Sequence, residues 1–331
     1  MDRRAVIAGT GMFVPEQVIG NDYFDRLLGE DVGTWLVENL TIRERRWCRE
    51  DESTADLCEA AARNILDKSG VSPEDLDLII VATDTPEFIS PSTSAVLQDR
   101  LGAKKAGTFD INTACAGFVT ALDVASKYII ADAQYQNVLV IGAYAMSKYL
   151  NKSDKKTVTL FADGAAGVLL QAQQDSGRGF LLSSLHTEGQ YNSWMGIYAG
   201  GTAQPASNGA LANHDHQLKF VRKFPRELNP LTWEKMIREM CRREGVQPSD
   251  IRHFFFTQIN INSIFETMDA LGIDRQRAYT VMDRYGYTGS ACIGMCLDDA
   301  IDRGKVKPGD LVTLVGSGVG YNYAGVALRM P

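Results

Sequence analysis

The sequence predicts an α/β protein in which one strand-and-helix unit occurs twice. Short runs such as residues 76–83 and 137–142 have continuous apolar centres, which is typical of strands buried between two layers of helices. These runs alternate with segments that carry the apolar periodicity of helices. Because the alternation repeats over two stretches of similar length, we expect a duplicated α/β fold with one half over residues 1–172 and the other over 173–331.

The first half begins with a short buried strand over residues 5–11 that is closed by glycines. Its Gly-x-Gly is followed by residues 12–15, where a dinucleotide site needs a third glycine and a helix, so no such site is expected. The other expected elements are a helix over 21–40 with Trp35 and Leu36 on its apolar side, a basic surface segment over 41–47, a helix over 54–66 capped by Ser53 or Thr54, a strand over 76–83, a helix over 92–101, a strand over 137–142, and a turn of small residues over 159–167 that enters a further strand.

The second half repeats the rhythm of strands and helices. Strands are expected over residues 180–185, 251–258, 310–320 and 323–329, and helices over 229–244, from 259 through 269, and over 289–302. The longest irregular stretch, residues 186–217, is rich in Gly, Asn, Ser and His. A loop of that length is usually functional or mobile.

The composition narrows the class of protein. The net charge of −7 and the isoelectric point near 5.2 argue against a nucleic-acid partner. No apolar run approaches the length of a membrane span and no signal peptide is expected, so we expect a cytoplasmic protein without membrane contact. Six cysteines are scattered without the spacing of a disulfide or zinc framework, so we expect free thiols and no metal site.

Cys115 is the residue around which the chain is organised. Residues 108–118 read as a strand that turns at 113–114 into a helix beginning near Cys115. The first turn of a helix presents unpaired N–H groups and the positive end of its dipole, which should lower the pKa of the thiol and favour the nucleophilic thiolate. A buried structural cysteine would leave the same local pattern, so this stretch alone favours neither interpretation.

Four ordered motifs decide between them, at residues 110–118, 161–166, 285–291 and 316–320. With these motifs the chain resembles the thiolase-fold condensing enzymes, specifically β-ketoacyl-acyl carrier protein (ACP) synthase III, over essentially its whole length. The resemblance implies a thiolase-like αβαβα layered fold and an acyl-S-Cys115 intermediate formed from an acyl-ACP or acyl-coenzyme A (CoA) thioester, with no bound cofactor. It also implies a dimer, either of two identical chains or with a second condensing enzyme.

The resemblance further implies which groups hold the reacting thioester. The backbone N–H of Cys115 and one from the turn at Gly318 and Val319 would bind the tetrahedral oxyanion. Glycines are needed there so that the backbone can approach the thioester.

Two departures from the family pattern concern catalysis. Thr257 stands where the family has a histidine, and Tyr287 stands where it has an asparagine, although Asn260 is present. In the family that pair stabilises the enolate left when a malonyl thioester loses carbon dioxide. Threonine and tyrosine hydroxyls can donate hydrogen bonds, but neither is cationic or an efficient base at neutral pH. His253 starts the same strand, too far from Thr257 to substitute for it, and is expected to be structural.

Two further departures concern substrate recognition. Trp35 matches the tryptophan that the family stacks near the CoA adenine, but Asn39 and Asn262 replace two expected arginines. A different basic surface could receive an acidic carrier protein, although the pattern favours a solvated surface cluster over such a site. Its candidate members are Arg43, Arg45, Arg46, Arg222, Lys223 and Arg226.

Three functional hypotheses follow. In the first, Cys115 receives an acyl group and passes it to an activated carbon, oxygen or nitrogen nucleophile in polyketide or fatty-acid-derived specialised metabolism, without malonyl decarboxylation. In the second, the chain is a non-catalytic partner subunit of a condensing-enzyme heterodimer. In the third, it is a decarboxylating β-ketoacyl synthase that uses Thr257, Asn260 and Tyr287.

Overall fold

Two five-stranded sheets with the same strand order form the framework of the molecule. The computed structural model describes residues 3–174 and 177–331. The strands of the first sheet, in spatial order, are β1 (Arg3–Phe13), β7 (Asp163–Gln174), β6 (Asn137–Ala145), β4 (Leu78–Ala82) and β5 (Gly107–Ile111). Those of the second are β8 (Gly179–Thr187), β14 (Asn322–Arg329), β13 (Leu311–Gly318), β11 (His253–Phe256) and β12 (Ala278–Tyr279).

The pairing directions repeat as well as the order. In the first sheet β4 is parallel to β5 and β6, and β7 is antiparallel to β6 and β1. In the second, β11 is parallel to β12 and β13, and β14 is antiparallel to β13 and β8. The strands of one sheet therefore correspond one by one to those of the other, which confirms the predicted duplication.

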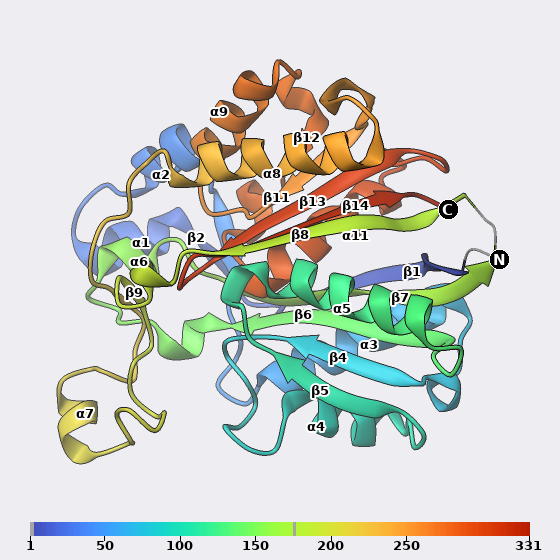
Figure 1. Cartoon of the computed structure of the whole chain (residues 1–331). Helices are drawn as coiled ribbons and strands as arrows, with labels where there is room; N and C mark the ends of the chain where they lie inside the picture. Colours follow the sequence, from blue (N-terminus) through green and yellow to red (C-terminus); the bar gives the residue numbers. More distant parts are fainter. Residues whose placement is uncertain (1–2, 175–176) are drawn as a thin grey trace.

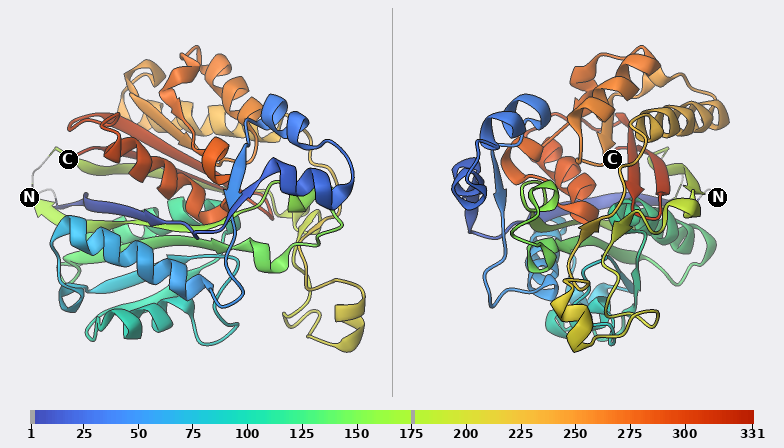
Figure 2. Two further views of the ribbon diagram at one scale, coloured as in Figure 1. Left: turned by 180° about the vertical axis from the view of Figure 1, so that it is seen from behind. Right: turned by 90° about the vertical axis from the view of Figure 1, so that its left-hand side faces the viewer.

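Helices fill the space between the sheets and cover their outer faces (Figure 1, Figure 2). The inner layer is formed by α5 (Gly117–Ala131), which contacts strands of both sheets, and by α11 (Cys292–Asp302). The outer helices are α3 (Thr54–Ser69) and α4 (Thr93–Leu101) on the first sheet, and α8 (Leu228–Glu244) and α9 (Ile261–Leu271) on the second. This is the αβαβα layering that the resemblance implies.

Helix α5 is buried because it lies between two apolar sheet faces. Its positions Phe118, Val119, Ala121 and Leu122 are at most 1% exposed. The window Ala114–Ala131 is the one stretch of the described chain with the length and apolarity of a membrane span, but 67% of it is buried inside the fold. Burial between two sheets accounts for that composition, because a core helix is apolar on all sides.

The predicted helix over residues 21–40 is two helices. The first, α1 (Asn21–Leu28), ends at Gly29, whose φ of 69° is left-handed, and the second, α2 (Gly33–Leu40), follows. Asp25 Oδ1 accepts the N–H groups of Val32 and Gly33 at 2.9 and 2.8 Å and holds the two helices together. Leu36 is buried as predicted, whereas Trp35 is 55% exposed, so the prediction that Trp35 packs inward is wrong.

The prediction of a basic surface segment over residues 41–47 is also wrong, because the centre of that segment is buried. Strand β3 (Glu44–Arg46) pairs with β2 (Val18–Gly20) and turns Arg45 inward, where it is completely inaccessible to solvent. Its guanidinium donates to Asn21 Oδ1 at 2.6 Å and to the Thr159 carbonyl, and lies 4.4 Å from the ring of Phe24. The side chain therefore ties three segments of the chain together.

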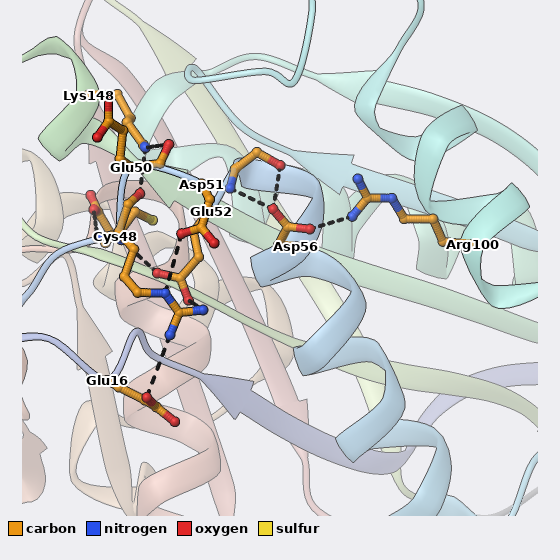
Figure 3. A network of polar contacts seen from close by, with 11 residues as sticks. Glu16, Cys48, Glu50, Asp51, Glu52, Asp56, Arg100 and Lys148 are labelled. Carbon is orange, nitrogen blue, oxygen red and sulfur yellow. Dashed lines mark hydrogen bonds and ion pairs between the residues drawn. The ribbon is translucent and has the colours of Figure 1, made fainter.

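The first turn of α3 is fixed by polar contacts (Figure 3). Ser53 and Asp56 form a capping box, and Asp56 also pairs with Arg100 of α4 at 2.8 Å. Just before the helix, the guanidinium of Arg49 lies 3.3 to 3.6 Å from three carboxylates, which belong to Glu16, Asp51 and Glu52. The predicted cap at Ser53 is confirmed, and the helix extends three residues beyond its predicted end.

The segment between β8 and α8 is mainly irregular, as predicted for residues 186–217. It contains only short elements, which are a 3₁₀ turn at Gly189–Tyr191, β9 (Met195–Gly196), α7 (Asn208–Ala212) and β10 (Lys219–Phe220). Helix α7 projects from the body of the molecule (Figure 1), whereas β9 and β10 pair with each other close to the layered core. Two other short helices, α6 (Lys155–Val158) and α10 (Met282–Tyr285), complete the described α-helices.

Candidate active site

A tight turn between β5 and α5 presents Cys115. Ala114 has the left-handed φ of 47°, and its N–H donates to Asn112 Oδ1 at 3.1 Å. Residues Ala114–Ala116 form a 3₁₀ turn that runs directly into α5, so the predicted strand, turn and helix are all present. Cys115 is 6% exposed, and its turn packs against β13 and β14 of the second sheet.

Cys115 lies where two cavities meet. One, here called the chamber, has a volume of about 280 Å³, and the other, called the passage, about 70 Å³. The chamber is lined by Asp84, Asn112, Cys115, Tyr144, Met146, Asn192, Met195, Gly196, Ile197, Tyr198, Leu218, Val319 and Gly320. The passage is lined by Cys115, Met195, Phe220, Phe224, Asn229, Ile259, Tyr287, Ser317, Gly318, Val319 and Tyr321.

The passage adjoins a larger cavity of about 650 Å³, here called the mouth, with which it shares Phe220. Trp35 and the lysines at 155, 156 and 223 line the mouth together with Glu30, Asp31, Val32, Leu36, Thr159, Leu160 and Val221. The mouth is thus lined by charged residues of both signs, with Lys155 paired to Glu30 at 3.0 Å, and Phe220 separates it from the passage that reaches Cys115.

The end of β13 approaches the cysteine turn closely. A Cβ added to Gly318 would lie 2.8 Å from the backbone nitrogen of Cys115 and 2.3 Å from the carbonyl oxygen of Thr113. Only glycine fits at this position, because real Cβ atoms do not come so near to backbone atoms. Val319, the next residue, lines both the chamber and the passage. The backbone groups expected to bind an oxyanion are thus side by side at the sulfur.

The pKa of Cys115 is raised well above its ordinary value, because burial disfavours the thiolate and the charge of Asp84 adds to that effect. The neighbouring Tyr287 hydroxyl and the cysteine's own backbone N–H act on this pKa in the opposite direction. The expected lowering of the pKa at the helix end is wrong, because burial outweighs it. The resting group is a thiol at neutral pH.

Comparison with known proteins identifies the family and the fold. A family model for 3-oxoacyl-[acyl-carrier-protein (ACP)] synthase III matches residues 109–189, and the model of its C-terminal part matches residues 241–330. The chain is 33% identical over 326 residues to the beta-ketoacyl-[acyl-carrier-protein] synthase III of Syntrophomonas wolfei, which covers 98% of this chain and 96% of that protein. The chain belongs to the β-ketoacyl-ACP synthase III family.

Other members extend the comparison. Acetoacetyl CoA synthase NphT7 of a Streptomyces species is 36% identical, over 96% of both chains. The crystal structure of 3-oxoacyl-[acyl-carrier-protein] synthase III from Aquifex aeolicus superposes with a TM-score of 0.88 at 32% identity, over 98% of this chain and 99% of that one. The protein is therefore a synthase III-like condensing enzyme with a duplicated thiolase-like fold, as predicted.

Tyr287 is held rigidly against Cys115 in this synthase III fold. Its backbone bridges to Phe161, its N–H donates to the Leu160 carbonyl at 2.9 Å, and its ring centroid lies 5.3 Å from that of Phe161. The side chain is 2% exposed. These contacts hold the ring in the wall of the passage that Cys115 also lines.

Thr257 and Asn260 are placed differently. The Thr257 hydroxyl accepts the Ser317 N–H at 2.9 Å and donates to the Ser317 carbonyl at 3.4 Å, and it lines neither the chamber nor the passage. Asn260 caps α9, where its Oδ1 accepts the N–H of Asn262 at 3.0 Å. His253 lies at the opposite end of β11 from Thr257, 3.6 Å from a carboxylate oxygen of Asp310. Of Thr257, Asn260 and Tyr287, the structure therefore brings only Tyr287 close to Cys115.

The predicted substrate-binding residues are only partly brought together. Trp35 lines the mouth, whereas Asn39 and Asn262 hydrogen bond to each other across α2 and α9, at 3.0 Å from Asn262 Nδ2 to the Asn39 carbonyl. Arg222 is exposed and lies 4.9 Å from the Trp194 ring, outside the lining of the mouth. The sequence interpretation missed Lys155 and Lys156, whose role as lining residues depends on how α6 packs against β10.

Asp84 and Asn229 were also missed. Asp84 follows β4 and lines the chamber, and Asn229 begins α8 and lines the passage. In each, Oδ1 is shielded from solvent and has no hydrogen-bond partner within residues 3–174 and 177–331. Burial raises the pKa of Asp84 to about 6. A usable signal existed for Asp84, because it follows a buried parallel strand directly adjacent to the strand that leads to Cys115.

Proposed function

We propose that this synthase III-like protein is an acyltransferase that carries its acyl group on Cys115 and transfers it to an already activated acceptor, without decarboxylating malonyl thioesters. The observation that supports this proposal is the position of Cys115 between two cavities, with Tyr287 lining one of them beside it and Gly318 close to its backbone. One cavity can hold the acyl group while the other admits the thioester arm and later the acceptor.

Loading follows from ordinary thioester exchange. The sulfur of Cys115 attacks the thioester carbonyl and forms a new S–C bond, and the carbonyl oxygen becomes an oxyanion facing the backbone at Cys115 and Gly318. When the tetrahedral intermediate collapses, the original S–C bond breaks and the carrier thiol leaves with the proton that Cys115 gives up. The product is acyl-S-Cys115.

Unloading needs an acceptor that brings its own reactivity. A carbon between two carbonyls, an amine or a hydroxyl attacks the acyl-S-Cys115 carbonyl, the bond to sulfur breaks, and the proton lost by the acceptor returns to the sulfur. Decarboxylation instead leaves an enolate that needs strong donors. The Thr257 hydroxyl is already bonded to Ser317 and Tyr287 offers one neutral O–H, so the site supports acyl transfer better than decarboxylation.

The donor is proposed to be an ACP or CoA thioester. Both carry a phosphopantetheine arm, and the mouth offers Lys155, Lys156 and Lys223 beside the exposed ring of Trp35.

We also propose a homodimer, because Phe88 and Ile89 are 53% and 83% exposed on one loop. Light scattering of the purified chain should give twice the monomer mass, and a monomer would contradict the proposal.

The test is the mass of the protein after incubation with acyl-ACP and acyl-CoA thioesters. We expect an acyl adduct on the unmodified chain and none on Cys115→Ala. The absence of an adduct with every donor, under conditions in which another synthase III loads, would favour the non-catalytic partner subunit instead. Release of carbon dioxide from malonyl-ACP by the loaded protein would contradict acyl transfer without decarboxylation.

A double variant examines the missing pair directly. Thr257→His combined with Tyr287→Asn restores the residues that the family resemblance places at these positions. We expect decarboxylation to appear only in the double variant, because both donors must face the enolate. Equal carbon dioxide release by the single variants would show that the pair is not what the native site lacks.

A further inference from the structure

Asp84 and the reacting residue Cys115 line the same chamber. Strands β4, β5 and β6 lie side by side, and their ends bring Asp84, Cys115 and Tyr144 respectively to the same edge of the sheet. The Asp84 side chain is partly buried, its Oδ1 is shielded from solvent, and no ion pair to it occurs in the part of the chain that the structure describes. It is the one carboxylate among the lining residues of the chamber.

A shielded carboxylate oxygen without a partner, such as Oδ1 of Asp84, is unfavourable unless something supplies a hydrogen bond or a positive charge. The other polar groups of the chamber, including those of Asn112, Asn192 and Tyr198, do not hydrogen bond to Oδ1. An alkyl chain in the chamber would leave the carboxylate unpaired and would displace any water that solvates it. An acyl group with its own donor would remove that cost.

We propose that Asp84 selects the acyl group, and that the chamber takes acyl groups that carry a hydrogen-bond donor, an ammonium or a hydroxyl, in place of plain alkyl chains. The inference rests on the proposed function, because it names the class of acyl group that Cys115 receives. Recognition of this kind discriminates strongly, since an analogue without the donor leaves a buried polar group unpaired.

The same residue does not serve to activate the nucleophile. The charge of Asp84 raises the pKa of Cys115, whereas the hydroxyl of Tyr287 lowers it. A base that assists the thiol would have to hydrogen bond to it and favour the thiolate, whereas Asp84 disfavours the thiolate and forms no hydrogen bond with Cys115 among the described residues. An ammonium bound at Asp84 would neutralise the opposing charge, so the preferred substrate would also ease the loading of Cys115.

The test is the competition of matched thioesters for Cys115. Butyryl-, 3-hydroxypropionyl- and β-alanyl-CoA differ only in a terminal methyl, hydroxyl or ammonium group, and propionyl-, glycolyl- and glycyl-CoA form the same series one atom shorter. Equimolar pairs are reacted briefly with the full chain, and the acylated Cys115 peptides are quantified by mass spectrometry. We expect at least one donor-bearing group to exceed its alkyl counterpart by about tenfold.

Variants assign the preference to Asp84. Asp84→Leu should lose or reverse the preference, and Asp84→Asn should lose the preference for ammonium while keeping part of that for hydroxyl. Asp123→Asn is the matched control, because one oxygen of this buried residue also lacks a partner, but the other pairs with Lys127 at 2.7 Å and the residue lines no part of the chamber. It should keep the selectivity of the unmodified chain.

Failure of the two proposals is distinguishable. An adduct with alkyl selectivity equal to or above that of the donor-bearing groups at both lengths, or a donor preference that Asp84→Leu leaves intact, would overturn the role of Asp84 alone. The absence of any adduct on Cys115 would overturn the proposed function and this inference together.

Discussion

At the scale of single residues, Cys115 is governed by two neighbours with opposite effects. The Tyr287 hydroxyl lowers the pKa of Cys115, and the charge of Asp84 raises it. The sequence predicted Cys115 and Tyr287 because both lie in ordered motifs. It could not show that burial keeps the sulfur protonated, since that depends on how completely two sheets enclose one turn.

Replacing Tyr287 should weaken the nucleophile without unfolding the protein. Tyr287→Phe removes the donor to the sulfur, so the pKa of Cys115 rises further and alkylation by iodoacetamide at neutral pH slows by about tenfold. The measurement is the alkylation rate as a function of pH, with circular dichroism as a check on folding. Tyr144→Phe is the control, because Tyr144 lines the chamber without bonding to the sulfur; an equal effect of both variants would rule out a specific role for Tyr287.

Replacing Asp84 should stabilise the folded chain at alkaline pH. Its pKa is about 6 in the fold against 3.8 for the ordinary group, so the stability that its protonated form contributes is complete below pH 3.8 and is lost as the pH rises through about 6. The unfolding free energy of Asp84→Asn should therefore exceed that of the unmodified chain by about 1 to 3 kcal/mol more at pH 8 than at pH 4. Urea unfolding at both pH values measures this, and a pH-independent difference would contradict it.

At the scale of elements, the active site depends on two turns that meet. One joins β5 to α5 and presents Cys115, and the other follows β13 at Gly318. Apolar runs and small residues predicted both, because strand ends and glycine turns leave local signals in the sequence. The break at Gly29 within the predicted helix over 21–40 was missed, although a helix-ending glycine is itself such a signal.

Gly318→Ala should separate these two turns. The new Cβ would overlap the Thr113 carbonyl at 2.3 Å, so the backbone must move away from Cys115 and the oxyanion donors lose their alignment. We expect acylation of Cys115 to fall by about 100-fold or more, as loss of one oxyanion donor typically does. The intact mass after timed incubation measures it.

Gly107→Ala provides the comparison for that variant. Gly107 lies at the start of β5, and its added Cβ would meet the nearest atom, of Leu78, at an ordinary 3.7 Å. Acylation by this variant should remain near that of the unmodified chain. Equal losses in both variants would mean that general destabilisation, and not the meeting of the turns, explains the Gly318 effect.

At the scale of the whole molecule, the predicted duplication appears as two sheets with matching strand order. The strands of the first sheet come from residues 3–174 and those of the second from 179–329. Regular alternation of strands and helices made this predictable. The packing of residues 21–47 against the core was not, because nothing in the sequence distinguishes the buried Arg45 from the charged residues around it.

Arg45 should contribute strongly to global stability. Arg45→Ala removes its donors to Asn21 and Thr159 and leaves a cavity under Phe24, so we expect a loss of about 3 to 5 kcal/mol in unfolding free energy. Chemical denaturation measures the loss. Arg46→Ala, on the same strand, removes a half-exposed pair with Glu44 at 3.5 Å and should cost about 1 kcal/mol or less. Similar losses of unfolding free energy in the two variants would contradict the larger contribution of Arg45 to stability.

The volume of the chamber limits the size of the acyl group. A cavity of about 280 Å³ holds about nine water-sized groups at roughly 30 Å³ each. An acyl group of up to eight or nine non-hydrogen atoms therefore fits beyond the sulfur. A fatty acyl chain of the length found in membrane lipids has about twice that number of atoms. An enzyme with such a limit would act at the first step of chain assembly or attach a small building block. Its product would then depend on the size of the chamber as well as on the reactivity of Cys115.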